Sequence, residues 1–202
     1  PDIFSCQLDR DTWIASADIP ESIISRVNAL GITVKVSRSS PSGKYPGTAI
    51  FNAARVGRFF IHNLRYTDEI LAGTATSLGL KSIHVSQGYV RCSIIPVDKN
   101  SLISEDDGVS KVAKKNGLVA CQIHNGPVVL NGHKHGFLGG ASGILPDGNI
   151  LFVGDITTHQ DFHVIDKFLK NRKKRFFHLP KLPLLDIGTV MFFSDKVPGL
   201  NE

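Results

Sequence analysis

The sequence lacks the features that assign many chains to a class at once. Only three cysteines occur among its 202 residues, and none has the C-x-x-C or C-x-x-H spacing of a metal or redox motif. They are Cys6, Cys92 and Cys121, which we interpret as reduced thiols of a cytoplasmic protein. No apolar run approaches the roughly 20 residues of a membrane-spanning helix, so we expect no membrane partner.

A strong charge imbalance is missing as well, and methionine is scarce. The chain has 23 Lys and Arg against 18 Asp and Glu, and its net charge of +5 permits an acidic partner without requiring one. Its single methionine is Met191, and it opens with PDIFSCQL. We therefore expect a processed chain or a fragment.

What the sequence does contain is a pattern that repeats along its length. Each copy has an apolar strand, a turn rich in Asp, Asn or Gly, a second strand, a helix and a third strand. Acidic or hydroxyl residues begin the helices, and Gly31, Gly79 and Gly117 end three of them. Because such units bury their faces only against neighbours, we predict one α/β domain over residues 1–202. The expected copies cover residues 2–37, 47–86, 88–124 and 136–180, followed by a terminal strand at 184–193.

Four stretches give the chain a family resemblance. They are YPGTAIFNAARVGRFFIHNLRYTD, QGYVRCSIIPVDKNSLISEDDGVSKVAKKNG, GFLGGASGIL followed by FVGD, and LLDIGTVMFF. In these stretches the chain resembles an uncharacterised bacterial family with the pentein fold, the fold of the guanidine-modifying enzymes. The resemblance implies an α/β propeller of ββαβ repeats around a pseudo-fivefold axis. It also implies an incomplete ring, because family members carry a further strand, helix and strand ahead of the position of Pro1.

The resemblance implies an enzyme whose catalytic residues differ from the usual ones. Guanidine-modifying enzymes resemble one another in a nucleophilic cysteine near the C-terminal end, a His-x-Asp base and acidic residues that hold the guanidinium. The strand LLDIGTVMFF has no cysteine, and no histidine precedes an acidic residue by two in a matching position. The first hypothesis is a hydrolase or transferase acting on C–N bonds of a small guanidino, amidino or related cationic compound, without a cofactor.

Cys92 is the favoured nucleophile, because it lies in an expected first strand that the fold turns toward a central channel. Such a thiol needs a lowered pKa, and Arg91 beside it in a strand would point to the opposite face. The alternative is a small buried thiol of the core. His62, at the end of RFFIHN, is the candidate base, with Asn63 orienting it or the substrate. The alternative for His62 is a structural hydrogen bond at the turn.

Acidic residues recur where a second strand meets its helix. Asp106 and Asp155 occupy this position in the third and fourth copies, and Asp18 and Asp68 lie at similar points in the first two. Such residues typically cap the helix that follows. In the functional interpretation, Asp106 takes part in catalysis and Asp155 binds a cationic substrate. Asp186 in LLDIG precedes no helix and is the favoured acidic ligand.

The stretch GHKHGFLGGASGILPDGNILFVGD is unusually poor in side chains. Gly139, Gly140 and Gly143 flank Ser142 on an expected first strand. Their small size either lets neighbouring backbones approach or leaves a floor for a ligand, with Gly140 and Ser142 as substrate-binding candidates. The histidines of GHKHG, His133 and His135, have two-residue spacing but no third ligand at a recognisable distance, so we expect an exposed loop and no metal site.

Two non-catalytic hypotheses remain open. The basic run KFLKNRKKR either forms a solvated helix end or binds phosphate groups of RNA or a ribosome. A channel that binds a small ligand without turnover is the other. The sequence does not indicate an oligomeric state.

Overall fold

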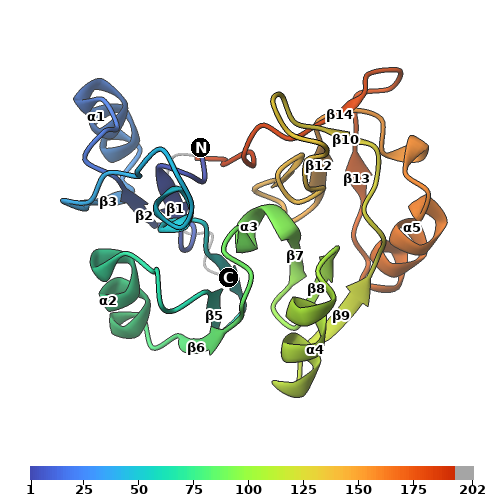
Figure 1. Cartoon of the computed structure of the whole chain (residues 1–202), viewed down its shortest axis with the longest axis horizontal. Helices are drawn as coiled ribbons and strands as arrows, with labels where there is room; N and C mark the ends of the chain where they lie inside the picture. The colour runs from blue at the N-terminus through green and yellow to red at the C-terminus, as the bar shows by residue number, and fades with distance from the viewer. Residues whose placement is uncertain (194–202) are drawn as a thin grey trace.

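The computed structural model describes residues 1–193, which form four three-stranded sheets and one two-stranded sheet (Figure 1). The first sheet contains β1 (Ser5–Gln7), β2 (Thr12–Ala15) and β3 (Thr33–Val36), with α1 (Glu21–Ala29) between β2 and β3. The second contains β4 (Ala54–Val56), β5 (Phe59–His62) and β6 (Lys81–His84), with α2 (Glu69–Ser77) between β5 and β6 and the short helix η1 (Gly47–Ala49) ahead of β4.

The third and fourth sheets follow the same plan. The third contains β7 (Ile94–Asp98), β8 (Ser101–Ser104) and β9 (Val119–Gln122), with the helical turn α3 (Val90–Ser93) before it and α4 (Asp107–Lys115) inside it. The fourth contains β11 (Ser142–Ile144), β12 (Ile150–Phe152) and β13 (Phe176–Phe177), with η2 (Ile156–Thr158) and α5 (Phe162–Asn171) between the last two. The strands β10 (Val128–Val129) and β14 (Leu184–Leu185) pair with each other in parallel.

Strand pairing confirms the predicted order of two strands, a helix and a strand. In every three-stranded sheet the first pair is antiparallel and the second pair is parallel. A helix connects each parallel pair, as a parallel connection requires. Gly31, Gly79 and Gly117 have positive φ angles just after α1, α2 and α4, which confirms them as the residues that end these helices.

The first strands are shorter than predicted. Residues 90–93, expected as strand, form α3, because the amides of Arg91 and Cys92 both donate to the side chain of Asn52 instead of to a strand. Residues 138–141 form a turn before β11, and most of 184–193 is irregular apart from β14 and a single bridge between Gly143 and Val190. Residues 48–53 likewise precede β4 as η1 and turns.

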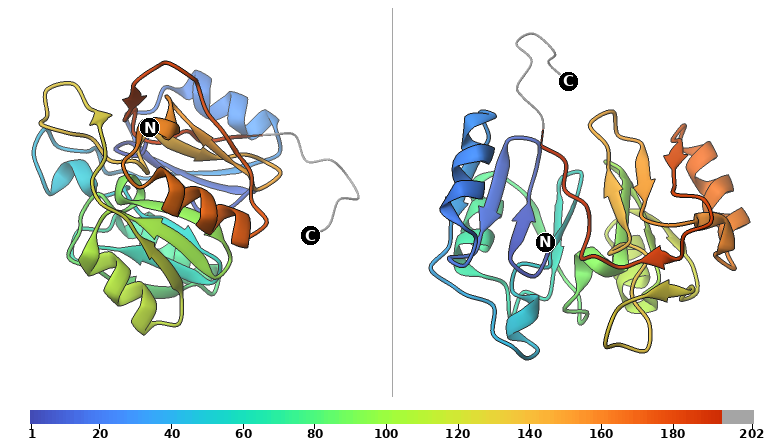
Figure 2. Two further views of the ribbon diagram at one scale, coloured as in Figure 1. Left: turned by 90° about the vertical axis from the view of Figure 1, so that its right-hand side faces the viewer. Right: turned by 90° about the horizontal axis from the view of Figure 1, so that it is seen from above.

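First strands of successive sheets lie side by side. β4 contacts β7, and β7 contacts β11. The backbone of Val190 donates to Ser142 O at 2.9 Å, while the side chain of Gln7 donates to Phe192 O at 3.0 Å, so this segment connects the fourth sheet to the first. The helices α1, α2, α4 and α5 lie at the periphery, and α1 and α5 are on opposite sides of the molecule (Figures 1 and 2).

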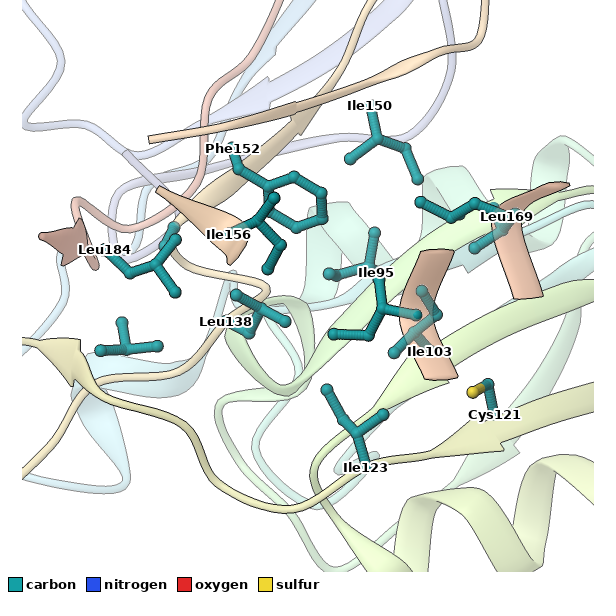
Figure 3. Packing of buried hydrophobic residues seen from close by; sticks show 14 residues of the cluster. Ile95, Ile103, Cys121, Ile123, Leu138, Ile150, Phe152, Ile156, Leu169 and Leu184 are labelled. Carbon is teal, nitrogen blue, oxygen red and sulfur yellow. The ribbon is translucent and has the colours of Figure 1, made fainter. Parts of the chain in front are cut away.

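The largest buried cluster joins the third and fourth sheets. Ile95 and Ile103 of the third sheet pack with Phe152 and Leu169 of the fourth and with Leu184 of β14 (Figure 3). Full burial of such a side chain contributes about 1.5–3 kcal/mol to folding. Within residues 1–193, no helix has the length and apolar character needed to cross a bilayer.

Candidate functional site

The thiol of Cys92 lies between a carboxylate and an amide. Its Sγ–H donates to Oδ2 of Asp2 at 2.8 Å, and Nδ2 of Asn52 donates to Sγ at 3.4 Å. The Oδ1 atom of Asn52 accepts from the backbone amides of Arg91 and Cys92 at 2.7 and 3.2 Å. A single asparagine therefore binds the first turn of α3 and positions the sulfur.

Asp2 is almost completely buried, at 1% exposure. Its backbone amide donates to Gly188 O at 3.1 Å, which holds it beside the segment after β14. Among the described residues, Oδ1 of Asp2 has no hydrogen-bond partner. A Cβ atom at Gly188, which has a φ of 72°, would lie 2.6 Å from that oxygen, so the carboxylate needs a glycine here.

Asp186 is a second buried carboxylate at this place. Its Oδ2 accepts from the Phe137 amide and its Oδ1 from the Gly188 amide, both at 2.9 Å. A Cβ atom at Gly140 would overlap the Asp186 carboxylate, and the Gly140 amide donates to Cys92 O at 3.1 Å. The glycine-rich stretch therefore permits a close approach of α3 and Asp186. This geometry agrees with the interpretation in which the small residues let neighbouring backbones approach.

Burial and like charges control the ionisation of this cluster. Burial raises the pKa of the Cys92 thiol well above its ordinary value, and the nearby Asp2 and Asp186 carboxylates raise it further. Burial also raises the pKa of Asp2, against the opposing effects of the Cys92 hydrogen bond and the Arg91 charge. Burial raises the pKa of Glu105 to about 7, although that carboxylate accepts from the amides of Leu138 and Gly126. A nucleophilic thiol needs a lowered pKa, and the surroundings of Cys92 act in the opposite direction.

The side chain of Arg91 does not point to the face opposite Cys92, as it would in a strand. Because α3 is helical, its guanidinium does not point away across a sheet. Nη1 donates to Ile94 O at 2.9 Å and to Gly139 O at 3.3 Å. Its charge acts on Asp2, Cys92 and Cys6.

His62 has structural partners on both ring nitrogens. Nδ1 lies 2.7 Å from Thr67 Oγ1 and Nε2 lies 2.9 Å from Ala49 O. Burial lowers the pKa of His62 to about 4, so the ring is neutral and Nε2 donates to the carbonyl. The side chain of Asn63 donates to Ser86 O at 3.0 Å and accepts from the Arg65 amide at 3.3 Å. These contacts are those of the structural alternative, and within residues 1–193 neither side chain is hydrogen-bonded to Cys92.

The other acidic candidates cap helices. Asp106 accepts from the Val109 amide at the start of α4, and Asp155 accepts from the Thr157 amide at the start of η2. The hydrogen bond from Thr157 Oγ1 lowers the pKa of Asp155 to about 2. Asp68 caps α2 as expected, whereas α1 begins after Pro20 and Asp18 instead accepts from Ser40.

The remaining candidates have ordinary structural surroundings. The hydroxyl of Ser142 donates to Gly139 O inside the fold, so it supports the turn before β11. Cys6 and Cys121 are buried, and burial raises the pKa of Cys6 to about 12. His133 and His135 are exposed, and residues 1–193 contain no group of His, Cys, Asp and Glu suited to hold a metal ion.

The basic helix end is partly neutralised. Lys170 pairs with Asp166 at 2.6 Å, and Arg172 lies 3.7 Å from Asp98 and over the ring of Phe168. Binding of RNA or a ribosome at this end stays a prediction.

Sequence reasoning did not identify Asp2, Asn52 or Glu105. Asp2 and Asn52 lie 90 and 40 residues from Cys92 in the chain. No local spacing indicates such contacts. The one available signal is that Asn52 lies in the FNAA stretch that carries the family resemblance.

Solved structures with a similar fold include two enzymes. A C. jejuni agmatine deiminase superposes with a TM-score of 0.51 at 10% identity, over 89% of this chain and 69% of the other. A dimethylarginine dimethylaminohydrolase in an adduct with S-methyl-L-thiocitrulline gives a TM-score of 0.48 at 14% identity, over 79% and 63%. Both are pentein-fold enzymes, and the first likeness shows a pentein-like fold for this chain.

Comparison at the level of sequence gives a family. None of the curated proteins compared with this chain matches it. The profile of one family matches residues 1–191, which is nearly the whole chain. The chain therefore belongs to the family of unknown function DUF6873.

Proposed function

We propose that this protein is an enzyme of the guanidine-modifying type, with Cys92 as nucleophile and a small guanidino or amidino cation as substrate. The observation that carries the proposal is the contact of the Cys92 thiol with Asp2, beside the second buried carboxylate of Asp186. The pentein-like fold supports it as a framework in which such chemistry occurs in a neighbour, an agmatine deiminase.

The charges of the cluster favour a cationic ligand. Asp2 interacts with the charge of Arg91, and the carboxyl groups of Asp186 and Glu105 add to the acidic character of the cluster. The free Oδ1 atom of Asp2 offers an acceptor among the described residues that no protein group uses. A guanidinium or amidinium is planar and donates two parallel hydrogen bonds to one carboxylate, so it matches this acceptor better than a compact ammonium.

The same cation activates the thiol. In the resting protein the raised pKa keeps Cys92 protonated, but a bound positive charge stabilises the thiolate and lowers that pKa. The thiol proton then passes to Asp2, whose own raised pKa makes it a suitable acceptor. Sγ forms a bond to the central carbon, and one C–N bond breaks as the departing nitrogen takes a proton and leaves as ammonia or an amine. Water then cleaves the S–C bond and restores the thiol.

The proposed architecture is an incomplete propeller. The four ββαβ sheets and the segment 189–193 occupy five positions around a pseudo-fivefold axis. Support comes from the neighbouring first strands and from the hydrogen bonds of Val190 and Gln7 that connect the fourth sheet with the first.

A panel of guanidino and amidino compounds tests the function. A true substrate raises the melting temperature by mass action and releases ammonia or an amine. Cys92→Ser keeps the fold and the thermal shift but loses turnover, while the control Cys121→Ser, outside the cluster, keeps both. Full turnover by Cys92→Ser, or no thermal shift with any compound, contradicts the proposal.

Binding without turnover is the second candidate. It is favoured by the 7% exposure of Cys92 and by its raised pKa, which both oppose a reactive resting thiol. It predicts equal thermal shifts for the wild type and Cys92→Ser and no product from either.

A further inference from the structure

A large cavity opens at the hairpin turns of the sheets. It has a volume of about 1050 Å³ and is lined by the turns after β1, β4, β7 and β11 together with residues 189–192. Arg91 lines it, whereas Cys92, Asp2 and Asp186 do not. The cavity is therefore separate from the thiol site, although the consecutive residues Arg91 and Cys92 belong to the two sites.

Basic side chains outnumber acidic ones around this cavity. The acidic residues are Asp9, Asp11 and Asp98. The basic residues come from all four three-stranded sheets or their connections and number twice as many: Arg10, Arg55, Arg58, Arg91, Lys99 and Lys174.

Ion pairs reduce the acidic contribution further. Asp9 pairs with Arg55 at 2.9 Å, and Asp98 pairs at 3.7 Å with Arg172, which does not line the cavity. Within the described chain, the side chains of Arg10, Lys99 and Lys174 have no hydrogen bond or ion pair. Unpaired cations from three different connections thus converge on one concave space.

We propose that this cavity binds a small polyanion that carries two or more phosphate or carboxylate groups. Guanidinium groups bind such oxygens bidentately, and lysines add point charges that need no fixed geometry. A concave wall of one charge sign also focuses the field on its interior. The volume of about 1050 Å³ lies just above the usual range for small-molecule sites, about 300–1,000 Å³, so the cavity has room for more than a single phosphate ion.

The ligand differs in charge from the one proposed at Cys92. That cluster is acidic and takes a cation, whereas this cavity is basic and takes an anion. Failure of either proposal leaves the other standing, because the two sites share no ligand-binding side chain.

The experiment uses the whole chain and two probes at constant ionic strength, inorganic tripolyphosphate and citrate. Each is titrated by calorimetry and by thermal shift. We expect tripolyphosphate, citrate or both to raise the melting temperature in a saturable manner. The stronger probe identifies phosphate or carboxylate as the natural group.

A triple variant tests the location of the site. Arg10→Gln/Lys99→Gln/Lys174→Gln removes three unpaired cations, and we expect the dissociation constant to rise at least tenfold, which corresponds to about 1.4 kcal/mol. The matched control changes three exposed cations elsewhere, Lys35, Arg38 and Lys44, to Gln and keeps the affinity. No saturable binding, or an equal loss in both triple variants, overturns the proposal.

Discussion

The thiol of Cys92 donates a hydrogen bond of 2.8 Å to the carboxylate of Asp2, a residue 90 positions earlier in the chain. Both groups are buried, and burial raises both pKa values, so the proton between them is shared by two weak acids that each resist ionisation. A thiol beside a cation alone would be deprotonated and reactive at rest. In the proposed mechanism this thiol instead stays protonated until a cationic substrate binds, so the charge of the substrate controls the reactivity of Cys92.

Asp2→Asn tests this coupling directly. The substitution keeps an acceptor for the thiol but removes a negative charge that raises the pKa of Cys92, so that pKa falls. We expect the alkylation of Cys92 at pH 8 to become several-fold faster, as measured by mass spectrometry of the Cys92 peptide across a pH series. The alkylation of Cys121 in the same samples serves as the control. An unchanged pH profile for Cys92 would mean that the Asp2 charge has no influence on the thiol.

Gly140→Ala tests the close approach at Asp186. The new methyl group overlaps the Asp186 carboxylate, and we expect a loss of about 1–3 kcal/mol in the free energy of unfolding, measured with urea. The matched control is Gly73→Ala in α2, where an added Cβ meets no atom within 4 Å. That change gains about 0.5–1 kcal/mol through helix propensity. Equal effects at both positions would remove the packing role of Gly140.

Glu105→Gln tests a burial effect with a definite pH signature. Burial raises the pKa of Glu105 from 4.5 to about 7, so the native state binds a proton more tightly than the unfolded state. The contribution of Glu105 to the free energy of unfolding is therefore fully present below pH 4.5. It falls by on the order of 3 kcal/mol as the pH rises to about 7. The uncharged variant lacks this loss, so its stability relative to the wild type rises between pH 4.5 and 7 in urea titrations. A constant difference over this range contradicts the assignment.

His62→Gln tests a pH dependence of stability with the opposite sign to that of Glu105. Burial lowers the pKa of His62 from 6.5 to about 4, so its stabilisation is present above pH 6.5 and is lost as the pH falls to about 4. We expect the variant to be less stable than the wild type at pH 7, because two hydrogen bonds are weakened, and the gap to narrow toward pH 4. His133→Gln, a change at an exposed histidine, serves as the matched control. A catalytic role for His62 would appear instead as lost turnover with unchanged stability.

The repeated ββαβ pattern could be predicted from the sequence because each of its signals lies within a few residues. Turn residues, helix caps such as Asp68, and the helix-ending glycines act within a few residues, and the structure has them where the sequence predicts them. The first strands were overestimated for the converse reason. Residues 90–93 have a strand-like apolar pattern, but the side chain of Asn52, from the segment before β4, accepts hydrogen bonds from the amides of Arg91 and Cys92 in the helical turn.

The candidate site was only half predictable. Cys92 and Asp186 stood out as polar residues in apolar strands, and the glycine-rich stretch indicated a close approach without saying of what. The partners that give the site its character, Asp2 and Asn52, come from distant segments and have no signal in their own surroundings. His62 stood out for its residue type, yet its hydrogen bonds to Thr67 and Ala49 are those of a structural residue.

The amide of Asp2 bonds to Gly188 O, and this contact has a consequence for biosynthesis. A ribosome delivers Asp2 and Cys92 long before it delivers Asp186 and Gly188, so a nascent chain exposes the thiol without the full set of carboxylates. The cluster of Asp2, Cys92 and Asp186 is assembled only when the late segment docks against the early one. Unfinished or C-terminally clipped chains therefore carry the Cys92 thiol without the carboxylate of Asp186.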